Sequence, residues 1–346
     1  MKNQNKIIKI SDRKNRSSQI LDDYFHIIPP DFFKTLHTYL FSRDIPDEDS
    51  MARHSLFESQ INKLRGLFKA HVVELNKSFK KRFPNYLEYR LDEKGIPKDK
   101  YNEFLNNIDK FVDLVMSDNE PLAKIIEKTG VKEWNSFNTP YPLGNRYLRR
   151  FNKSTDEIVS LIDSFDPRYG KYKKRIRIID GTKNSYSNTF FDKKENKVEV
   201  EIRNDVGDFS KADDLIHEIG HALDMLEKAD AGIDTEEISK FEMEYSAIDF
   251  SHRFYPNIFS ESEQKLIRYN NLSGIASTLF EIDVFQNPDQ DFDKAYAKAI
   301  KRCYPMFKDA SNPFYVLYKR FILRPIGELS TNIIETELYL KEAKTS

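Results

Sequence analysis

Residues 217–221 read His-Glu-Ile-Gly-His, and this pentapeptide constrains the chain more than any other segment. Residues four apart on an α-helix lie on the same face, so His217 and His221 are expected one above the other. Two imidazoles at this spacing are the pair that a helix offers to a Zn²⁺ ion, and Glu218 between them falls beside the metal. The pentapeptide therefore predicts a helix that carries a zinc site.

The residues around the pentapeptide continue the helical pattern. Ser210 and Asp213 form an S-x-x-D capping pattern, which predicts a helix start at about residue 211. An apolar stripe follows at helical spacing and consists of Ile216, Ile219, Leu223 and Leu226. Asp214 and Asp224 bracket the histidines on the polar face. These aspartates either orient the imidazoles through the second ring N–H or are solvated carboxylates, and the sequence leaves both open.

Two segments upstream of this helix alternate apolar and polar side chains, as half-buried strands do. They are residues 175–179 and 197–203. Strand, turn, strand and a metal-bearing helix is the order of elements in zinc peptidases of the zincin type, whose edge strand can pair with an extended substrate. A plain sheet edge in an α+β protein gives the same pattern, so the strands alone do not favour a peptide substrate.

A catalytic zinc site needs a third protein ligand and keeps one position open for water. No third histidine follows at the short spacing of the metzincins. We predict that Glu244 supplies this ligand from a helix over 235–253, capped by Asp234. Glu244 shares its face with mostly apolar or small residues, and a carboxylate buried there needs a partner. Glu242, on a wetter face, and the more distant Glu281 are the alternatives.

Three segments taken together are similar to one family of enzymes. Residues 215–223 match an L-x-H-E-x-G-H motif, residues 241–247 carry Glu244 ahead of small residues, and residues 313–319 read Pro-Phe-Tyr-Val-Leu-Tyr-Lys. In these segments the chain resembles the thimet oligopeptidase and oligoendopeptidase F group of zinc peptidases, of the H-E-x-x-H plus Glu (gluzincin) type. The resemblance implies a zincin-like fold, bound Zn²⁺, and Tyr315 and Tyr318 as stabilisers of an oxyanion.

The resemblance covers residues 170–325 and includes departures from the family pattern. Asp224 stands where family members usually have another histidine, no histidine precedes the tyrosines in residues 307–312, and the chain is much shorter than a typical member. The tyrosines also fit an apolar stripe that faces a core. A rival resemblance is to the lethal-factor-like proteases, but residues 279–285 fit their third-ligand segment only in part.

The composition limits the partners and the compartment. A net charge of −1 gives no strong field that would select nucleic acid or a membrane surface. The single cysteine, Cys303, excludes a disulfide framework and indicates a reducing compartment. The N-terminus has no apolar stretch long enough for a Sec signal or a membrane span. We expect a cytoplasmic protein or, alternatively, one exported without a Sec signal; the oligomeric state is unknown.

The predicted fold class is α+β and predominantly helical, with a zincin-like catalytic core and a small β-sheet beside the active-site helix. We divide the chain into a disordered basic arm (1–20), an N-terminal helical region (21–145) and a zincin-like catalytic region (146–346), with the boundary near a Tyr/Pro/Gly-rich segment. Periodicity predicts helices over residues 56–83, 101–116, 158–165, 211–227, 235–253, 260–270, 273–286, 290–303, 313–323 and 327–342.

These observations lead to three functional hypotheses. The first is a zinc peptidase acting on peptides or proteins, with Glu218 as general base for a water molecule and with Tyr315, Tyr318 or His252 stabilising the oxyanion. The second is an effector-type metalloprotease that cleaves one specific host protein, suggested by the short chain and the glutamates within residues 335–342. The third is a non-catalytic helical binding protein in which the motif is a relic.

Overall fold

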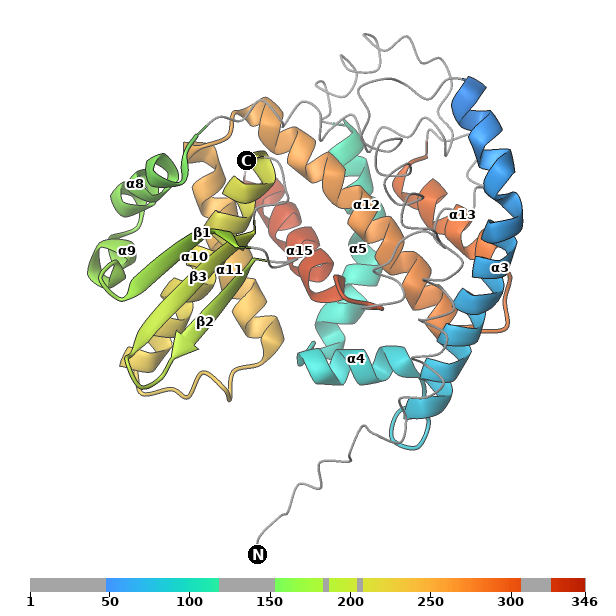
Figure 1. The fold of residues 1–346 in the computed structure, drawn as a ribbon, viewed down its shortest axis with the longest axis horizontal. Coiled ribbons are helices and arrows are strands. Elements are labelled where there is room, and N and C mark those ends of the chain that lie inside the picture. Colours follow the sequence, from blue (N-terminus) through green and yellow to red (C-terminus); the bar gives the residue numbers. More distant parts are fainter. Residues whose placement is uncertain (1–47, 118–152, 183–186, 204–207, 306–324, 346) are drawn as a thin grey trace, which may run out of the picture.

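The computed structural model describes most of the chain (Figure 1). The described residues are 48–117, 153–182, 187–203, 208–305 and 325–345. The predicted basic arm, the predicted boundary near residue 145, and the segment with Tyr315 and Tyr318 lie outside these residues. All three therefore stay predictions.

The described elements alternate long helices with one short run of strands, in the order α3 (Glu48–Phe79), α4 (Tyr86–Lys94), α5 (Lys98–Ser117), α8 (Thr155–Phe165), α9 (Pro167–Tyr172), β1 (Ile176–Thr182), β2 (Asn188–Asp192), β3 (Lys197–Arg203), α10 (Asp208–Asp230), α11 (Lys240–Phe254), the 3₁₀ turn η2 (Tyr255–Asn257), α12 (Glu261–Gln286), α13 (Phe292–Cys303) and α15 (Leu329–Thr345). The predicted fold class, α+β and predominantly helical with a small sheet beside the helix of the pentapeptide, is confirmed.

The elements gather into two lobes joined by the C-terminal helix (Figure 1). The sheet with α8, α9, α10 and α11 forms the sheet lobe, and α3, α4, α5 and α13 form the helical lobe. The long helix α12 packs against α3, α4, α5 and α13, and α15 packs against both α11 and α5. Because α15 contacts a helix of each lobe, it fixes the sheet lobe relative to the helical lobe.

The sheet has three strands in the order β1-β3-β2. The central strand β3 pairs in parallel with β1 and antiparallel with β2. Its valines and Ile202 are buried as the alternation predicts, and β3 packs on α10. The sequence analysis did not predict β2, which lies at the outer edge of the sheet and also contacts α10. The pentapeptide helix is therefore covered by both β3 and the edge strand.

Several predicted helix boundaries are wrong. The helix predicted over 56–83 spans Glu48–Phe79, and the helix predicted to start at about residue 211 starts at Asp208. Two further differences have a clear physical reason. The helix α11 begins at Lys240 rather than at residue 235, because Ser239 and Glu242 form a capping box in which each side chain bonds the other's backbone N–H. Asp234, the predicted cap, instead pairs with Lys193 at 2.8 Å. The helices predicted over 260–270 and 273–286 form the single helix α12, because residues along its whole length are buried and tertiary packing overrides weak local propensity.

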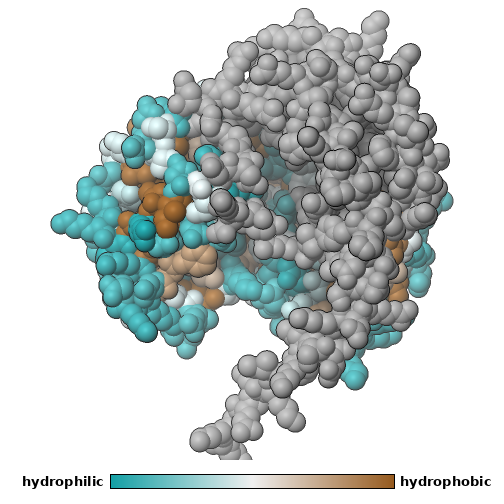
Figure 2. All heavy atoms as spheres, viewed as in Figure 1, coloured by the Kyte–Doolittle hydropathy of each residue, from teal (hydrophilic) through white to brown (hydrophobic). Residues whose placement is uncertain are grey.

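The surface of the sheet lobe is mostly hydrophilic, with a hydrophobic area of limited extent on the face shown in Figure 2. Among the side chains that the structure describes, the exposed large hydrophobic ones are Phe190 on β2 and Ile233, which follows α10. Single exposed apolar side chains are ordinary on protein surfaces. None of the helices in the described ranges is both long and apolar enough to cross a bilayer.

Candidate metal centre

His217 and His221 on α10 and Glu244 on α11 converge into one cluster of metal-competent atoms. The two imidazole Nε2 atoms lie 3.1 Å apart. The carboxylate oxygens of Glu244 lie 3.5 Å from Nε2 of His217 and 4.0 Å from Nε2 of His221. Within the part of the chain that the structure describes, this is the group of His, Cys, Asp or Glu donors close enough to share a metal ion. The cluster is partly open, since the Glu244 side chain is 34% exposed.

This donor set fits Zn²⁺. Tetrahedral zinc with bonds of about 2.0–2.1 Å keeps its ligand atoms roughly 3.3 Å apart. The two Nε2 atoms lie 3.1 Å apart, the nearest carboxylate oxygens of Glu244 lie 3.5 Å (Oε2) and 4.0 Å (Oε1) from them, and one ligand atom from each residue can be chosen so that all three lie within 4.8 Å. Burial, with the neighbouring His217 adding to it, lowers the pKa of His221 to about 3. His221 is therefore neutral at pH 7, which is the form of imidazole that binds a metal.

Gly220 explains why Glu244 reaches the histidines. A Cβ added at Gly220 would lie 2.9 Å from the Cα of Ala247 and 3.1 Å from its carbonyl oxygen. Only glycine on α10 opposite a small residue on α11 therefore permits the two backbones to approach so closely. Ala247 lies three residues after Glu244 and so near the same face of α11. A glycine inside a helix costs about 0.5–1 kcal/mol relative to alanine, and the close packing of α10 on α11 offsets it.

The two alternative third ligands have other partners. Oε2 of Glu242 accepts hydrogen bonds from the backbone N–H and the hydroxyl of Ser239, at 3.2 and 3.1 Å. Glu281 on α12 is buried, and its Oε1 accepts a hydrogen bond of 2.8 Å from the backbone N–H of Ile326. Of the three glutamates considered in the sequence analysis, Glu244 is therefore the one that the structure brings to the histidines.

Glu218 lies beside the cluster, and its carboxylate accepts a hydrogen bond from a residue of the sheet. It is 8% exposed, and the hydroxyl of Thr189 on β2 lies 2.6 Å from Oε2 and 3.0 Å from the Glu218 carbonyl oxygen. Burial raises the pKa of the Glu218 carboxyl, while His217 and the Thr189 hydrogen bond act in the opposite direction. A carboxylate with raised proton affinity beside a metal site is suited to act as a general base.

The aspartates that bracket the histidines do not orient the imidazoles in this structure. Asp214 accepts hydrogen bonds from the hydroxyl of Ser187 at 2.7 Å and from Nε of Arg203 at 2.8 Å. Asp224 pairs with Lys228, one turn later on α10, at 2.8 Å. Asp214 therefore ties α10 to the sheet, and Asp224 supports the helix itself.

His252 is not placed to stabilise an oxyanion. It lies eight residues after Glu244, about 12 Å further along α11 at about 1.5 Å per residue. Its side chain is 3% exposed and pairs with Glu335 at 2.7 Å and with Glu342 at 3.0 Å. His252 therefore belongs to the contact between α11 and α15, and that alternative from the sequence analysis is wrong. Tyr315 and Tyr318 stay predictions, since they lie outside the described residues.

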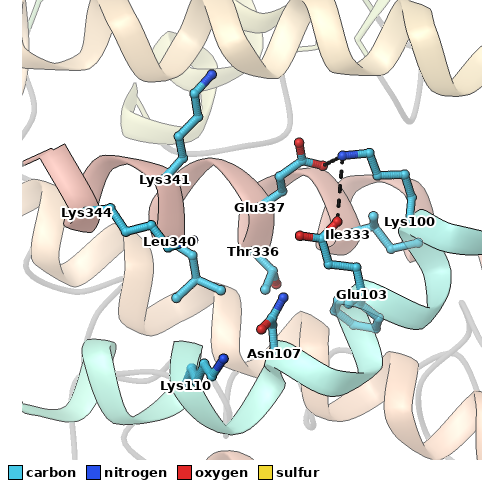
Figure 3. A pocket seen from close by; sticks show the side chains of 11 residues that line it. Lys100, Glu103, Asn107, Lys110, Ile333, Thr336, Glu337, Leu340, Lys341 and Lys344 are labelled. Atoms are coloured by element: carbon cyan, nitrogen blue, oxygen red, sulfur yellow. Dashed lines mark hydrogen bonds and ion pairs between the residues drawn. The ribbon is translucent and has the colours of Figure 1, made fainter.

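A cavity of about 240 Å³ lies between α5 and α15, away from the cluster (Figure 3). At one end Glu337 pairs with Lys100 at 2.8 Å and accepts a hydrogen bond of 3.4 Å from the hydroxyl of Tyr245 on α11. Phe104 and Leu340 are among the apolar side chains that line it. No residue of the metal cluster lines this cavity, so we assign the site to the convergence of α10, α11 and β2 instead.

Neither a family model nor a curated protein sequence matches the chain. Two solved structures share its fold: PZ peptidase A with an inhibitor, with a TM-score of 0.61 and 14% identity, and one assigned to oligoendopeptidase F, with a TM-score of 0.62 and 17% identity. Each comparison covers 95% of this chain, which spans 66% of the length of the other. The resemblance to the oligoendopeptidase F group predicted from the sequence is thereby confirmed at the level of the fold.

Proposed function

We propose that the chain is a zinc-dependent peptidase in which Glu218 is the general base. The observation that carries this proposal is the convergence of His217, His221 and Glu244, with the buried Glu218 between the two histidines on α10. The shared fold with peptidase structures supports the same reaction class. Fold alone does not determine chemistry, so the proposal depends on the geometry of these four side chains.

The three predicted ligands and Glu218 would have different roles. His217, His221 and Glu244 would hold the ion with one position left open. When bound, Zn²⁺ supplies a Lewis acid that polarises the scissile carbonyl and lowers the pKa of water. Because Thr189 holds Oε2 of Glu218, Oε1 is the oxygen that would take a proton from the attacking water and later deliver it to the leaving amine.

The edge strand β2 supports a peptide or protein as substrate. Its outer edge faces away from β3, so its backbone N–H and C=O groups can pair with an extended segment of another chain. Pairing of this kind supplies affinity through main-chain hydrogen bonds, without a strong demand on the substrate's side chains. Thr189 on the same strand touches Glu218, which would place a peptide paired with β2 beside the general base.

The effector-type hypothesis loses one of the two features that suggested it, the acidic residues near the end of the chain. The glutamates of residues 335–342 pair within the protein: Glu335 and Glu342 with His252, and Glu337 with Lys100. Their acidity is therefore explained by the packing of α15. Cleavage of generic short peptides would support the peptidase as proposed. Inertness toward them, together with cleavage of a single protein, would support the effector, and neither cleavage nor zinc would support the non-catalytic binding protein.

A Glu218→Gln variant tests the mechanism. We expect it to bind zinc as the wild type does, because no ligand is changed, and to lose peptide cleavage by about 10²–10⁴-fold, the usual contribution of a general base. The measurements are elemental analysis and cleavage of a quenched fluorescent peptide. Glu242→Gln is the matched control, since Glu242 lies on the helix of the third ligand but serves its cap. Unimpaired cleavage by Glu218→Gln, or a wild type without zinc, would overturn the proposal.

A further inference from the structure

We propose that Thr189 is a positioning residue, which holds the general base Glu218 in its working orientation from the edge strand β2. The inference rests on the proposed function and adds to it a residue outside the H-E-x-x-H motif. Its basis is a single short contact, 2.6 Å between Oγ1 of Thr189 and Oε2 of Glu218. That length is typical of a hydroxyl that donates to an ionised carboxylate, among the stronger hydrogen bonds in proteins.

The direction of this hydrogen bond follows from the groups involved. A hydroxyl has one proton to donate, and an ionised carboxylate can only accept. The same hydroxyl lies 3.0 Å from the carbonyl oxygen of Glu218, which also only accepts. Both contacts therefore require Thr189 as donor, and the shorter one goes to the carboxylate. The bond favours the ionised form of Glu218, which is the form that a general base needs before catalysis.

The threonine is itself held in place by the sheet. Thr189 stands directly opposite Val200 of β3 in the antiparallel register, so the two side chains share one face. Val200 is fully buried, and β3 packs on α10. Threonine is branched at Cβ and has few rotamers about χ1, which leaves its hydroxyl little freedom. The hydroxyl thus reaches Glu218 from a rigid position.

This arrangement leaves one carboxylate oxygen for chemistry. With Oε2 bonded, rotation of the carboxylate would break the contact, and among the described residues no other hydrogen-bond partner holds Oε1. Losing such a bond lets the base sample other orientations, and small misplacements of a catalytic group cost large factors in rate. Because β2 is also the edge that would pair with a peptide, one strand would position both the substrate and the base.

The experiment compares Thr189→Val with Thr189→Ser in the full chain. Valine keeps the shape and removes the donor, so we expect kcat to fall by about tenfold or more, with KM, zinc content and thermal unfolding close to the wild type. Serine restores the donor and is expected to return kcat to within a few-fold. Thr182→Val is the control, because it removes a hydroxyl from β1 of the same sheet, and among the described residues this hydroxyl makes one hydrogen bond, a long one of 3.5 Å to the carbonyl of Ile202.

The outcomes separate the two proposals. An active wild type with an unimpaired Thr189→Val variant would overturn the role of Thr189 and leave the peptidase standing. Equal losses in Thr189→Val and Thr189→Ser, or loss of zinc in both, would show that the residue serves only packing between β2 and α10. A wild type that holds zinc and cleaves no peptide would overturn the peptidase and, with it, the positioning of its base.

Discussion

The helix α11 contributes to two clusters of histidine and glutamate. The clusters differ in the distance between their carboxylate oxygens and imidazole nitrogens. At the metal centre the carboxylate of Glu244 stands 3.5 and 4.0 Å from two imidazoles. At the contact with α15, by contrast, His252 touches Glu335 at 2.7 Å and Glu342 at 3.0 Å. The first cluster leaves room for a cation among its donors, whereas the second is closed by direct ion pairs.

The two clusters also hold their histidines in opposite charge states. Burial lowers the pKa of His221 to about 3, and the nearby His217 adds to this effect. Burial also disfavours the charged form of His252, but Glu335 and Glu342 outweigh it and raise its pKa to about 9. The same residue types therefore form a candidate ligand set in one place and a structural ion pair in the other. The number of carboxylates in direct contact with each imidazole decides between them.

Removal of a predicted ligand should change zinc affinity more than any change at the second cluster. In His221→Ala or Glu244→Ala the proposed zinc site would lose one of its three protein ligands, and we expect zinc affinity to fall by more than about 100-fold, since even outer-shell changes cost about 10–100-fold. His252→Gln should leave zinc affinity within a few-fold of the wild type, because His252 contacts α15 instead. Competitive titration with a chelator measures both. Equal losses in the two kinds of variant would contradict the separation of the clusters.

Between pH 6.5 and 9, the dependence of folding stability on pH should report the ionisation of His252 in the second cluster. The pKa of His252 is raised from 6.5 to about 9 in the folded protein, so the folded state binds more protons between these values. Its contribution is fully present below about pH 6.5 and is lost as the pH rises through 9. At 1.36 kcal/mol per pKa unit it amounts to roughly 3 kcal/mol.

Denaturant unfolding of metal-free protein from pH 6 to pH 10 measures this contribution. His252→Gln should flatten the decline between pH 6.5 and 9, because no imidazolium remains to lose its proton. The titratable groups in contact with His252 are Glu335, Glu342, Tyr255 and Tyr339. Asp213 and Arg268 contact these neighbours in turn, Asp213 through Tyr255 and Arg268 through Glu342. An unchanged slope in the variant would assign the decline to one of these groups.

The pair of histidines was predictable from the sequence because its geometry is local, whereas the position of Glu244 beside them also depends on the packing of α11 on α10. Helical spacing places His217 and His221 on one face, and an apolar face around Glu244 implies a partner for its carboxylate. The hydrogen-bond partner of Glu218, the proposed general base, was not predictable. Thr189 lies on a strand of five residues, Asn-Thr-Phe-Phe-Asp, with no alternation of apolar and polar side chains. This strand forms because β3 offers it an edge, which is a non-local cause.

The start of α11 was mispredicted for a different reason. The segment contains two competing S/T/D-x-x-E capping patterns, at Asp234 with Glu237 and at Ser239 with Glu242. Periodicity does not distinguish them. In the structure Asp234 is taken by Lys193, the residue after β2, so the second pattern caps the helix. Contacts between segments distant in the sequence thus decide where a helix begins.

The smallest expected effect concerns the glycine that lets α11 approach α10. In Gly220→Ala the new methyl group would meet the backbone of Ala247 at 2.9 Å, and relief requires the two helices to move apart. Overpacking of this kind costs about 1–3 kcal/mol of unfolding free energy. The same movement withdraws Glu244 from the histidines, so we also expect weaker zinc binding.

Gly66→Ala is the matched control for this glycine. Gly66 also lies inside a helix, α3, but a Cβ there would meet nothing within 4 Å. Alanine should therefore stabilise the protein by about 0.5–1 kcal/mol through helix propensity alone. The two variants change the same atoms and predict opposite signs in thermal unfolding. A stabilising Gly220→Ala with unchanged zinc affinity would show that the close approach of α10 and α11 is not what brings Glu244 into the cluster.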